Sequence, residues 1–176
     1  MPRVPLAEFE PALKRRLEEL WGTPPNFYRC LGNHPQLIAA WTEFARTVRH
    51  DFRTPRALRE LLILRAAQLM GSEYEWAHHL AMARKAGVAE GQIENLAGWR
   101  TSSLFDARER AALALAEGVT QGRVSDAVYE EARRHFDAHD YIELSLTAAL
   151  YAMVGRLIDA MQVPLEPGLK VSPPLP

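Results

Sequence analysis

Residues 59–79 read RELLILRAAQLMGSEYEWAHH, and this stretch decides the fold. Its apolar residues recur at helical rather than alternating intervals. Gly71 is typical of the position just after a helix, and Ser72 begins the S-x-x-E pattern of a capping box that opens another helix. The stretch therefore predicts two helices joined by a tight turn, and antiparallel packing of the two would allow Glu60 to reach His79.

Proline, glycine and capping residues divide the rest of the chain in the same way, into about eight helices. No segment shows the alternating pattern of a strand. The expected helices cover residues 11–21, 35–49, 55–70 with Thr54 as N-cap, 72–86, 90–97, 107–117 after Asp106, 126–136 after Ser125, and 138–161. We expect an all-α, single-domain helical bundle over residues 1–165, followed by a proline-rich tail over 166–176.

Length and charge narrow the classes of function. The 176 residues are 48% hydrophobic, which suits one globular domain. With 21 basic and 22 acidic residues there is no positive field to attract nucleic acid or an anionic membrane. Cys30 is the single cysteine, so an intramolecular disulfide and a cysteine-rich zinc site are excluded. The charged N-terminal segment lacks a signal-peptide hydrophobic region, and we expect a soluble, cytoplasmic protein.

The helix that begins at Ser72 carries ionisable groups on one face. At 100° per residue, Ser72, Glu75 and His79 fall within about 60° of one another. Ala83 and Ala86 continue that face, and their small side chains would leave room for a ligand. A carboxylate beside an imidazole is a common arrangement for general acid–base catalysis. The neighbouring His78 points away, so His79 is the candidate acid–base group.

Each of these residues also has a structural interpretation. Ser72 and Glu75 together make a capping box, which by itself would explain both residues. A core histidine hydrogen-bonded to buried Glu60 would explain His79. We therefore keep both a catalytic and a purely structural interpretation open for this stretch.

The spacing of these four residues resembles that of the alkylhydroperoxidase D-like and carboxymuconolactone decarboxylase superfamily, whose peroxidase branch reads E-x11-C-x2-C-x3-H. Residues 22–29, 34–35, 106–115 and 124–156 are similar to the longer, peroxidase-related members, although Ala152 stands where those usually have asparagine. Ser72 and Glu75 occupy the two cysteine positions, and neither can form a sulfenate or a disulfide. Glu75-Trp76 followed by His79 is similar to the E-W-x-x-H stretch of the decarboxylase branch.

The resemblance implies a cofactor-free acid–base enzyme that acts on a small organic acid or lactone by decarboxylation or isomerisation. His79 would be the general acid or base, Glu60 would orient it and hold its pKa near neutrality, and Glu75 would be a second carboxylate. Ser72 and Tyr151 would contact the substrate. The resemblance also implies a homo-oligomer, a trimer or hexamer, and no metal or other cofactor.

Other functions remain open at this point. An antioxidant peroxidase would have to use Cys30 or a thiol from a partner. A helical oligomer with a decayed site would have no catalytic activity. The two carboxylates and the imidazole suit one divalent metal ion, whereas a di-iron centre needs a second E-x-x-H motif, which the sequence lacks. Arg59 and Arg65 are either ordinary surface residues or recognise a substrate carboxylate.

Overall fold

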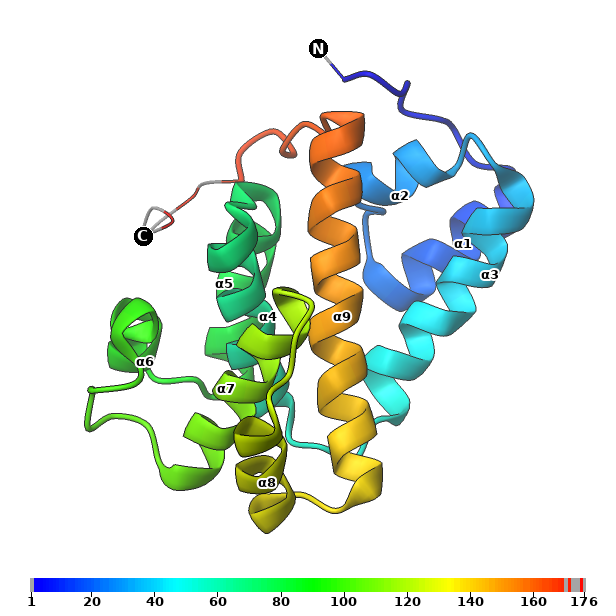
Figure 1. The fold of residues 1–176 in the computed structure, drawn as a ribbon. Helices are drawn as coiled ribbons and strands as arrows, with labels where there is room; N and C mark the ends of the chain where they lie inside the picture. The colour runs from blue at the N-terminus through cyan, green and yellow to red at the C-terminus, as the bar shows by residue number, and fades with distance from the viewer. Residues whose placement is uncertain (1, 170, 172–174, 176) are drawn as a thin grey trace. The chain divides into compact units, whose positions relative to one another are not determined.

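The computed structural model describes residues 2–169, 171 and 175. Over these residues all regular structure is helical, with no strand, so the all-α prediction is confirmed (Figure 1). The elements are α1 (Pro11–Trp21), α2 (Asn26–Leu31), α3 (Pro35–Arg46), a π-helical turn (Thr47–Asp51), α4 (Arg56–Met70), α5 (Glu73–Ala86), α6 (Glu90–Glu94), a 3-10 turn (Leu96–Gly98), α7 (Ala107–Thr120), α8 (Asp126–His135) and α9 (Ala138–Met161).

The chain forms two compact units. The first joins Met1–Phe52 to Leu157–Leu169, and the second joins Arg53–Arg156 to Lys170–Pro176, so α9 contributes to both. In the first unit, Leu17 of α1 and Ile38 of α3 are fully buried. The second unit contains the predicted site and is the larger of the two.

The second unit is built on the α4–α5 pair, which runs antiparallel as expected (Figure 1). Small and aliphatic side chains let its helices approach closely. One apolar cluster joins α4 to α7, α8 and α9, and comprises Leu58, Leu62, Ala111, Ala112, Leu115, Ala116, Ala132, Phe136, Leu144 and Ala148. Another joins α4, α5 and α7 to the turn between α6 and α7, and Val171 and Leu175 of the expected tail pack against it. Residues 170, 172–174 and 176 of that tail lie outside the described residues.

Local sequence signals set most of the helix ends. Gly71 ends α4 with φ of +63° and Gly87 ends α5 with φ of +96°, a backbone region that side chains other than glycine seldom adopt. Ser72 accepts a hydrogen bond from the Glu75 amide, Asp106 from the Glu109 amide and Ser125 from the Val128 amide. The three predicted N-caps are confirmed.

Four predicted boundaries are wrong in detail. The 35–49 helix changes to π-helical form at Thr47. Apart from these boundaries, residues 26–31, which are not among the expected helices, form α2. The 90–97 helix divides into α6 and a 3-10 turn, while α7 continues to Thr120. Thr54 is not the N-cap of α4, which begins at Arg56 after Pro55.

The reason for the Thr54 error lies far along the chain. Glu143 of α9 accepts hydrogen bonds from the backbone amides of Arg53 (3.0 Å) and Thr54 (2.8 Å). Its carboxylate thus satisfies the amides that precede α4, a position where negative charge is favoured. Only the tertiary fold can supply a cap of this kind.

Helix α9 is the one helix of the described residues that is long and apolar enough to cross a membrane. Its buried polar residues, Glu143 and Thr147, and its packing through Leu144 and Ala148 are features of a core helix. Length and composition are therefore weak evidence for a membrane span here. Through Leu144 and Ala148, α9 is a central helix of the second unit.

Candidate active site

The site is formed where α4 and α5 face each other. Glu60 of α4 lies opposite His79 of α5, with 2.7 Å between its Oε2 atom and Nδ1 of the imidazole. Glu60 is fully buried and His79 is 5% exposed. The predicted contact between the two residues is confirmed, and its short length is typical of a charge-assisted hydrogen bond.

Glu75 approaches the other nitrogen of the same ring. Its Oε2 atom lies 3.4 Å from Nε2 of His79, one helical turn further along α5. This contact is longer than that of Glu60, so the Nε2 proton is held less firmly than the Nδ1 proton. The ring is therefore fixed on one side by Glu60 and carries its more transferable proton on the side of Glu75.

Glu75 does not act as half of a capping box. A capping box would need its carboxylate to accept the backbone amide of Ser72, but that amide donates to the carbonyl of Ala67 at 2.9 Å. Ser72 does cap the helix through its hydroxyl, at 3.4 Å from the Glu75 amide. The interpretation that explained Glu75 only by capping is wrong, and its side chain faces His79 instead.

The surroundings of the imidazole are partly as expected. The ring of Tyr151 in α9 meets that of His79 edge to face, with 4.7 Å between centroids. His78 points elsewhere, and its ring contacts that of Tyr74 in a tilted arrangement with 4.5 Å between centroids. Ala83, expected to leave room for a ligand, is instead fully buried in the apolar cluster. Ala83 therefore packs in the core and leaves no room for a ligand at its own position.

Arg56 is a member of the site that sequence reasoning missed. Its guanidinium donates to Oε1 of Glu60, with 2.7 Å from Nε, and its Nη2 lies 3.8 Å from the sulfur of Met82. The two oxygens of Glu60 are thus shared between Arg56 and His79. The i,i+4 spacing of Arg56 and Glu60 was the available signal, because residues four apart are neighbours on a helix.

The charges around His79 raise its proton affinity. Burial alone disfavours the imidazolium, but the Glu60 charge and hydrogen bond, with a smaller effect of Glu75, outweigh it and raise the pKa of His79 to about 9. In the same way, burial opposes ionisation of Glu60, but His79 and Arg56 hold the pKa of that carboxyl below its usual range. The prediction of a pKa near neutrality is corrected, and at pH 7 the imidazole is a proton donor.

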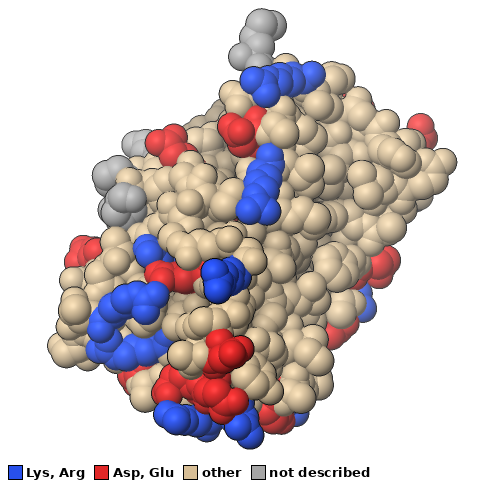
Figure 2. Space-filling model, viewed as in Figure 1, with Lys and Arg blue, Asp and Glu red and all other residues tan. Residues whose placement is uncertain are grey.

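Of the two arginines considered for substrate recognition, Arg59 is buried and Arg65 is partly buried. Arg59 is 4% exposed and donates from Nε to the carbonyl of Thr54 at 3.2 Å. Arg65 donates from Nε to Glu117 at 2.7 Å and also binds Gln68. Neither is the solvated surface residue that their charge alone would suggest. Elsewhere, basic and acidic side chains are interspersed on the face seen in Figure 2, as the balanced composition indicates.

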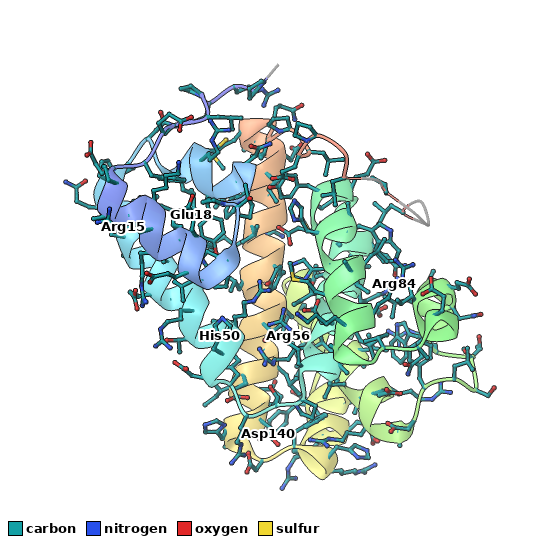
Figure 3. The ribbon with its side chains drawn as sticks, turned by 180° about the vertical axis from the view of Figure 1, so that it is seen from behind. Arg15, Glu18, His50, Arg56, Arg84 and Asp140 are labelled. Carbon is teal, nitrogen blue, oxygen red and sulfur yellow. The ribbon has the colours of Figure 1, made fainter. Side chains whose placement is uncertain are left out.

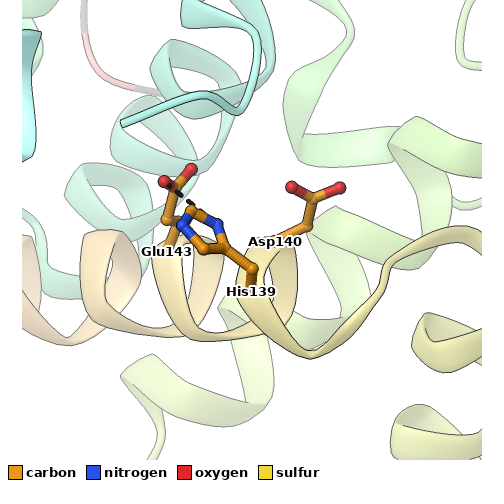
Figure 4. Close-up of side chains that lie close together, drawn as sticks. All are labelled: His139, Asp140 and Glu143. Atoms are coloured by element: carbon orange, nitrogen blue, oxygen red, sulfur yellow. Dashed lines mark ion pairs between the residues drawn. The ribbon is translucent and has the colours of Figure 1, made fainter. Parts of the chain in front are cut away.

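A second group of possible metal ligands lies at the start of α9. His139, Asp140 and Glu143 place one ligand atom each within 4.8 Å of the others (Figure 4). Positive charge is already supplied there by Arg53, whose Nε lies 2.8 Å from Asp140 Oδ1. Glu143 is engaged by the two backbone amides that precede α4. Ion pairing and helix capping account for this group.

The fold and the carboxylate–imidazole centre together define an all-α protein of the alkylhydroperoxidase D-like kind. The sequence profile of the carboxymuconolactone decarboxylase family matches residues 35–118. The chain belongs to this family.

Two relatives are described only as uncharacterized proteins. YnjA of Escherichia coli K12 is 32% identical over 149 residues, which are 83% of this chain and 76% of that protein. YdfG of Bacillus subtilis 168 is 35% identical over 94 residues, 52% of this chain. The chain spans 64% of YdfG, slightly less than two thirds of its length.

Solved structures share the fold. A peroxidase-related protein with an alkylhydroperoxidase core from Ralstonia eutropha JMP134 has a TM-score of 0.81 at 18% identity, covering 96% of this chain and 94% of that one. The debrominase Bmp8, in a variant bound to 2,3,4-tribromopyrrole, has a TM-score of 0.77 at 20% identity, covering 92% and 91%. At these identities the likeness concerns the fold and leaves the reaction of this chain open.

Proposed function

We propose that this protein is a cofactor-free acid–base enzyme that decarboxylates or isomerises a small organic acid or lactone. The observation that carries the proposal is the imidazole of His79 between two carboxylates, one of which, Glu75, is not needed for capping. Glu60 fixes the ring and keeps it protonated, while Nε2 presents its proton beside Glu75. An acid and a base one helical turn apart are sufficient for proton transfer without a metal or organic cofactor.

In the proposed chemistry His79 is the proton donor, and Glu75 is the base of the isomerisation. In an isomerisation, the Glu75 carboxylate takes a proton from a carbon next to the substrate carbonyl, and His79 donates its Nε2 proton to the far carbon of the resulting dienolate. The proton on Glu75 then returns to His79 across the 3.4 Å contact, which restores the starting state. In a decarboxylation, loss of carbon dioxide leaves the electron pair in an enolate or dienolate, His79 protonates its carbon, and a proton from water then restores the imidazolium. Ser72 and Tyr151 are proposed substrate contacts.

A thermal-shift screen tests the proposal. Small carboxylic acids and lactones are added to the wild type, to His79→Gln and to the matched control His78→Gln, since the ring of His78 contacts that of Tyr74 away from the centre. A substrate should raise the melting temperature of the wild type and the control by a few degrees, but not that of His79→Gln.

Each stabilising compound is then incubated in D2O, and uptake of deuterium at carbon is followed by NMR. The wild type should catalyse uptake and His79→Gln should not, with a loss on the order of 10² to 10⁴ in rate. Equal stabilisation and equal uptake in His79→Gln would show that His79 has only a structural role, as expected for a decayed site.

Cys30 does not favour the peroxidase alternative. Its thiol is buried in the first unit, and burial raises its pKa, although Arg29 partly opposes this. A raised pKa leaves little thiolate, the form that attacks peroxide. We propose a cytoplasmic protein, and the lack of a second cysteine supports this because disulfide bonds are typical of proteins in oxidising compartments.

We also propose that the protein assembles into a homo-oligomer, for which the family resemblance implies a trimer or hexamer. Ile142 (63% exposed) and Met153 (42% exposed) lie on one face of α9, with exposed Ala149 between them. An exposed apolar row on a long helix supports self-association. Light scattering should find more than one subunit for the wild type and a smaller mass for Ile142→Glu, with the exposed loop variant Leu104→Glu unchanged. A monomeric wild type would contradict the proposal.

A further inference from the structure

Arg56 stands where a basic residue is unfavourable for the helix itself. It is the first residue of α4, Arg59 follows in the same turn, and the turn contains no acidic residue. The positive end of the helix dipole disfavours cations at this place and favours anions. Since helix stability does not explain Arg56, its contacts with the rest of the second unit are the better guide to its role.

Those contacts lead to the acid–base centre. Arg56 binds Oε1 of Glu60, and Oε2 of Glu60 binds Nδ1 of His79. The guanidinium side chain is 27% exposed, whereas those of Glu60 and His79 are 0% and 6% exposed. Arg56 is therefore the most exposed member of a chain of charges that ends at His79.

We propose that Arg56 is the positioning residue of the His79 centre. It binds one oxygen of Glu60, and this orients the other oxygen to accept the hydrogen bond from Nδ1 of His79. This inference rests on the proposed acid–base function of His79. Without Arg56, the carboxylate would be free to turn about its last bonds, and the ring would lose the contact that fixes its orientation. Arg56 need not touch the substrate for this role.

Arg56 also completes the charge balance of the centre. Glu60 and Glu75 bring two negative charges, and His79 and Arg56 bring two positive ones. Arg59 on α4 interacts with Glu60, Arg56, Glu143 and Tyr151, and the ring of Tyr151 contacts that of His79.

NMR titration of protein with labelled histidines tests the inference without any substrate. Arg56→Gln should remove the exchange-protected Nδ1 proton signal and should lower the apparent pKa of His79, because the lost hydrogen bond with Glu60 is one of the contacts that raise that pKa. Arg56→Lys keeps the charge and should leave the pKa within about 0.3 units of the wild type. The matched control is Arg84→Gln, because Arg84 lies apart from Arg56 in Figure 3 and pairs with Glu90 of α6.

The inference is overturned if Arg56→Gln keeps both the wild-type pKa and the protected proton, or if Arg84→Gln changes them equally. Should Arg56→Gln not fold, the double variant Arg56→Gln/Glu75→Gln removes one charge of each sign and must still lose the protected proton. If a ligand binds the wild type but not His79→Gln, and Arg56→Gln titrates like the wild type, the role of Arg56 is wrong but the proposed function stands. The expected titration in a protein that binds and converts no acid or lactone overturns the proposed function alone.

Discussion

Replacing Glu60 by leucine is expected to lower the free energy of unfolding by about 3 to 5 kcal/mol at pH 7, because removal of one partner leaves the other buried charge uncompensated. Glu60 is fully buried and binds both Arg56 and His79. The loss would be a large part of the total stability of an ordinary domain, which is about 5 to 15 kcal/mol. Urea denaturation followed by circular dichroism measures it.

A surface pair supplies the control for this prediction. Glu130 pairs with Arg133 on α8, with both side chains more than half exposed. Glu130→Leu should cost no more than about 1 kcal/mol, the usual limit for exposed ion pairs. If Glu60→Leu costs no more than this control, the buried centre contributes little to stability.

The double variant Glu60→Leu/His79→Leu distinguishes the loss of stability caused by removing one partner from that caused by removing both. Removing both charged partners of a buried pair is often nearly neutral, so the double variant should be more stable than Glu60→Leu alone. Arg56 keeps its charge in this variant and can turn toward water because its side chain is already 27% exposed. Recovery of stability in the double variant would show that the cost arises from the stranded imidazolium.

Much of the fold could be predicted from the sequence because the signals that end helices are local. The predicted bounds of α1 and α9, residues 11–21 and 138–161, agree with the structure at both ends. The errors occur where distant residues act. Glu143 caps the start of α4 from about ninety positions away, and no pattern near Thr54 indicates this.

The site shows the same division between local and distant effects. Helical spacing was enough to place Glu75 beside His79, and the tight turn at Gly71 was enough to suggest the contact of Glu60 with His79. The direction of the His79 pKa shift could not be predicted from the sequence, because it depends on the balance between burial and two carboxylates that packing brings together. Arg56 was missed because its spacing to Glu60 is common on exposed helices, where such pairs have no function.

The free energy of unfolding at alkaline pH provides a further test of the protonated state of His79. The pKa of His79 is raised from its ordinary value of 6.5 to about 9, so the folded state holds this proton more tightly than the unfolded state. The resulting stability is fully present below about pH 6.5 and is lost as the pH rises through about 9. A shift of this size corresponds to roughly 3 kcal/mol.

His79→Gln has no proton to lose at this position, so the difference in unfolding free energy between the wild type and this variant should shrink between pH 6.5 and 9. Urea denaturation at half-unit pH intervals measures the difference, and subtraction removes the contributions of Cys30 and other groups common to both proteins. The control Leu104→Gln replaces an exposed residue that does not titrate and should remain parallel to the wild type. Parallel curves for the wild type and His79→Gln over this range would mean that Glu60 and Glu75 do not hold the imidazole in its charged form, and the role of His79 as the proton donor at neutral pH would have to be abandoned.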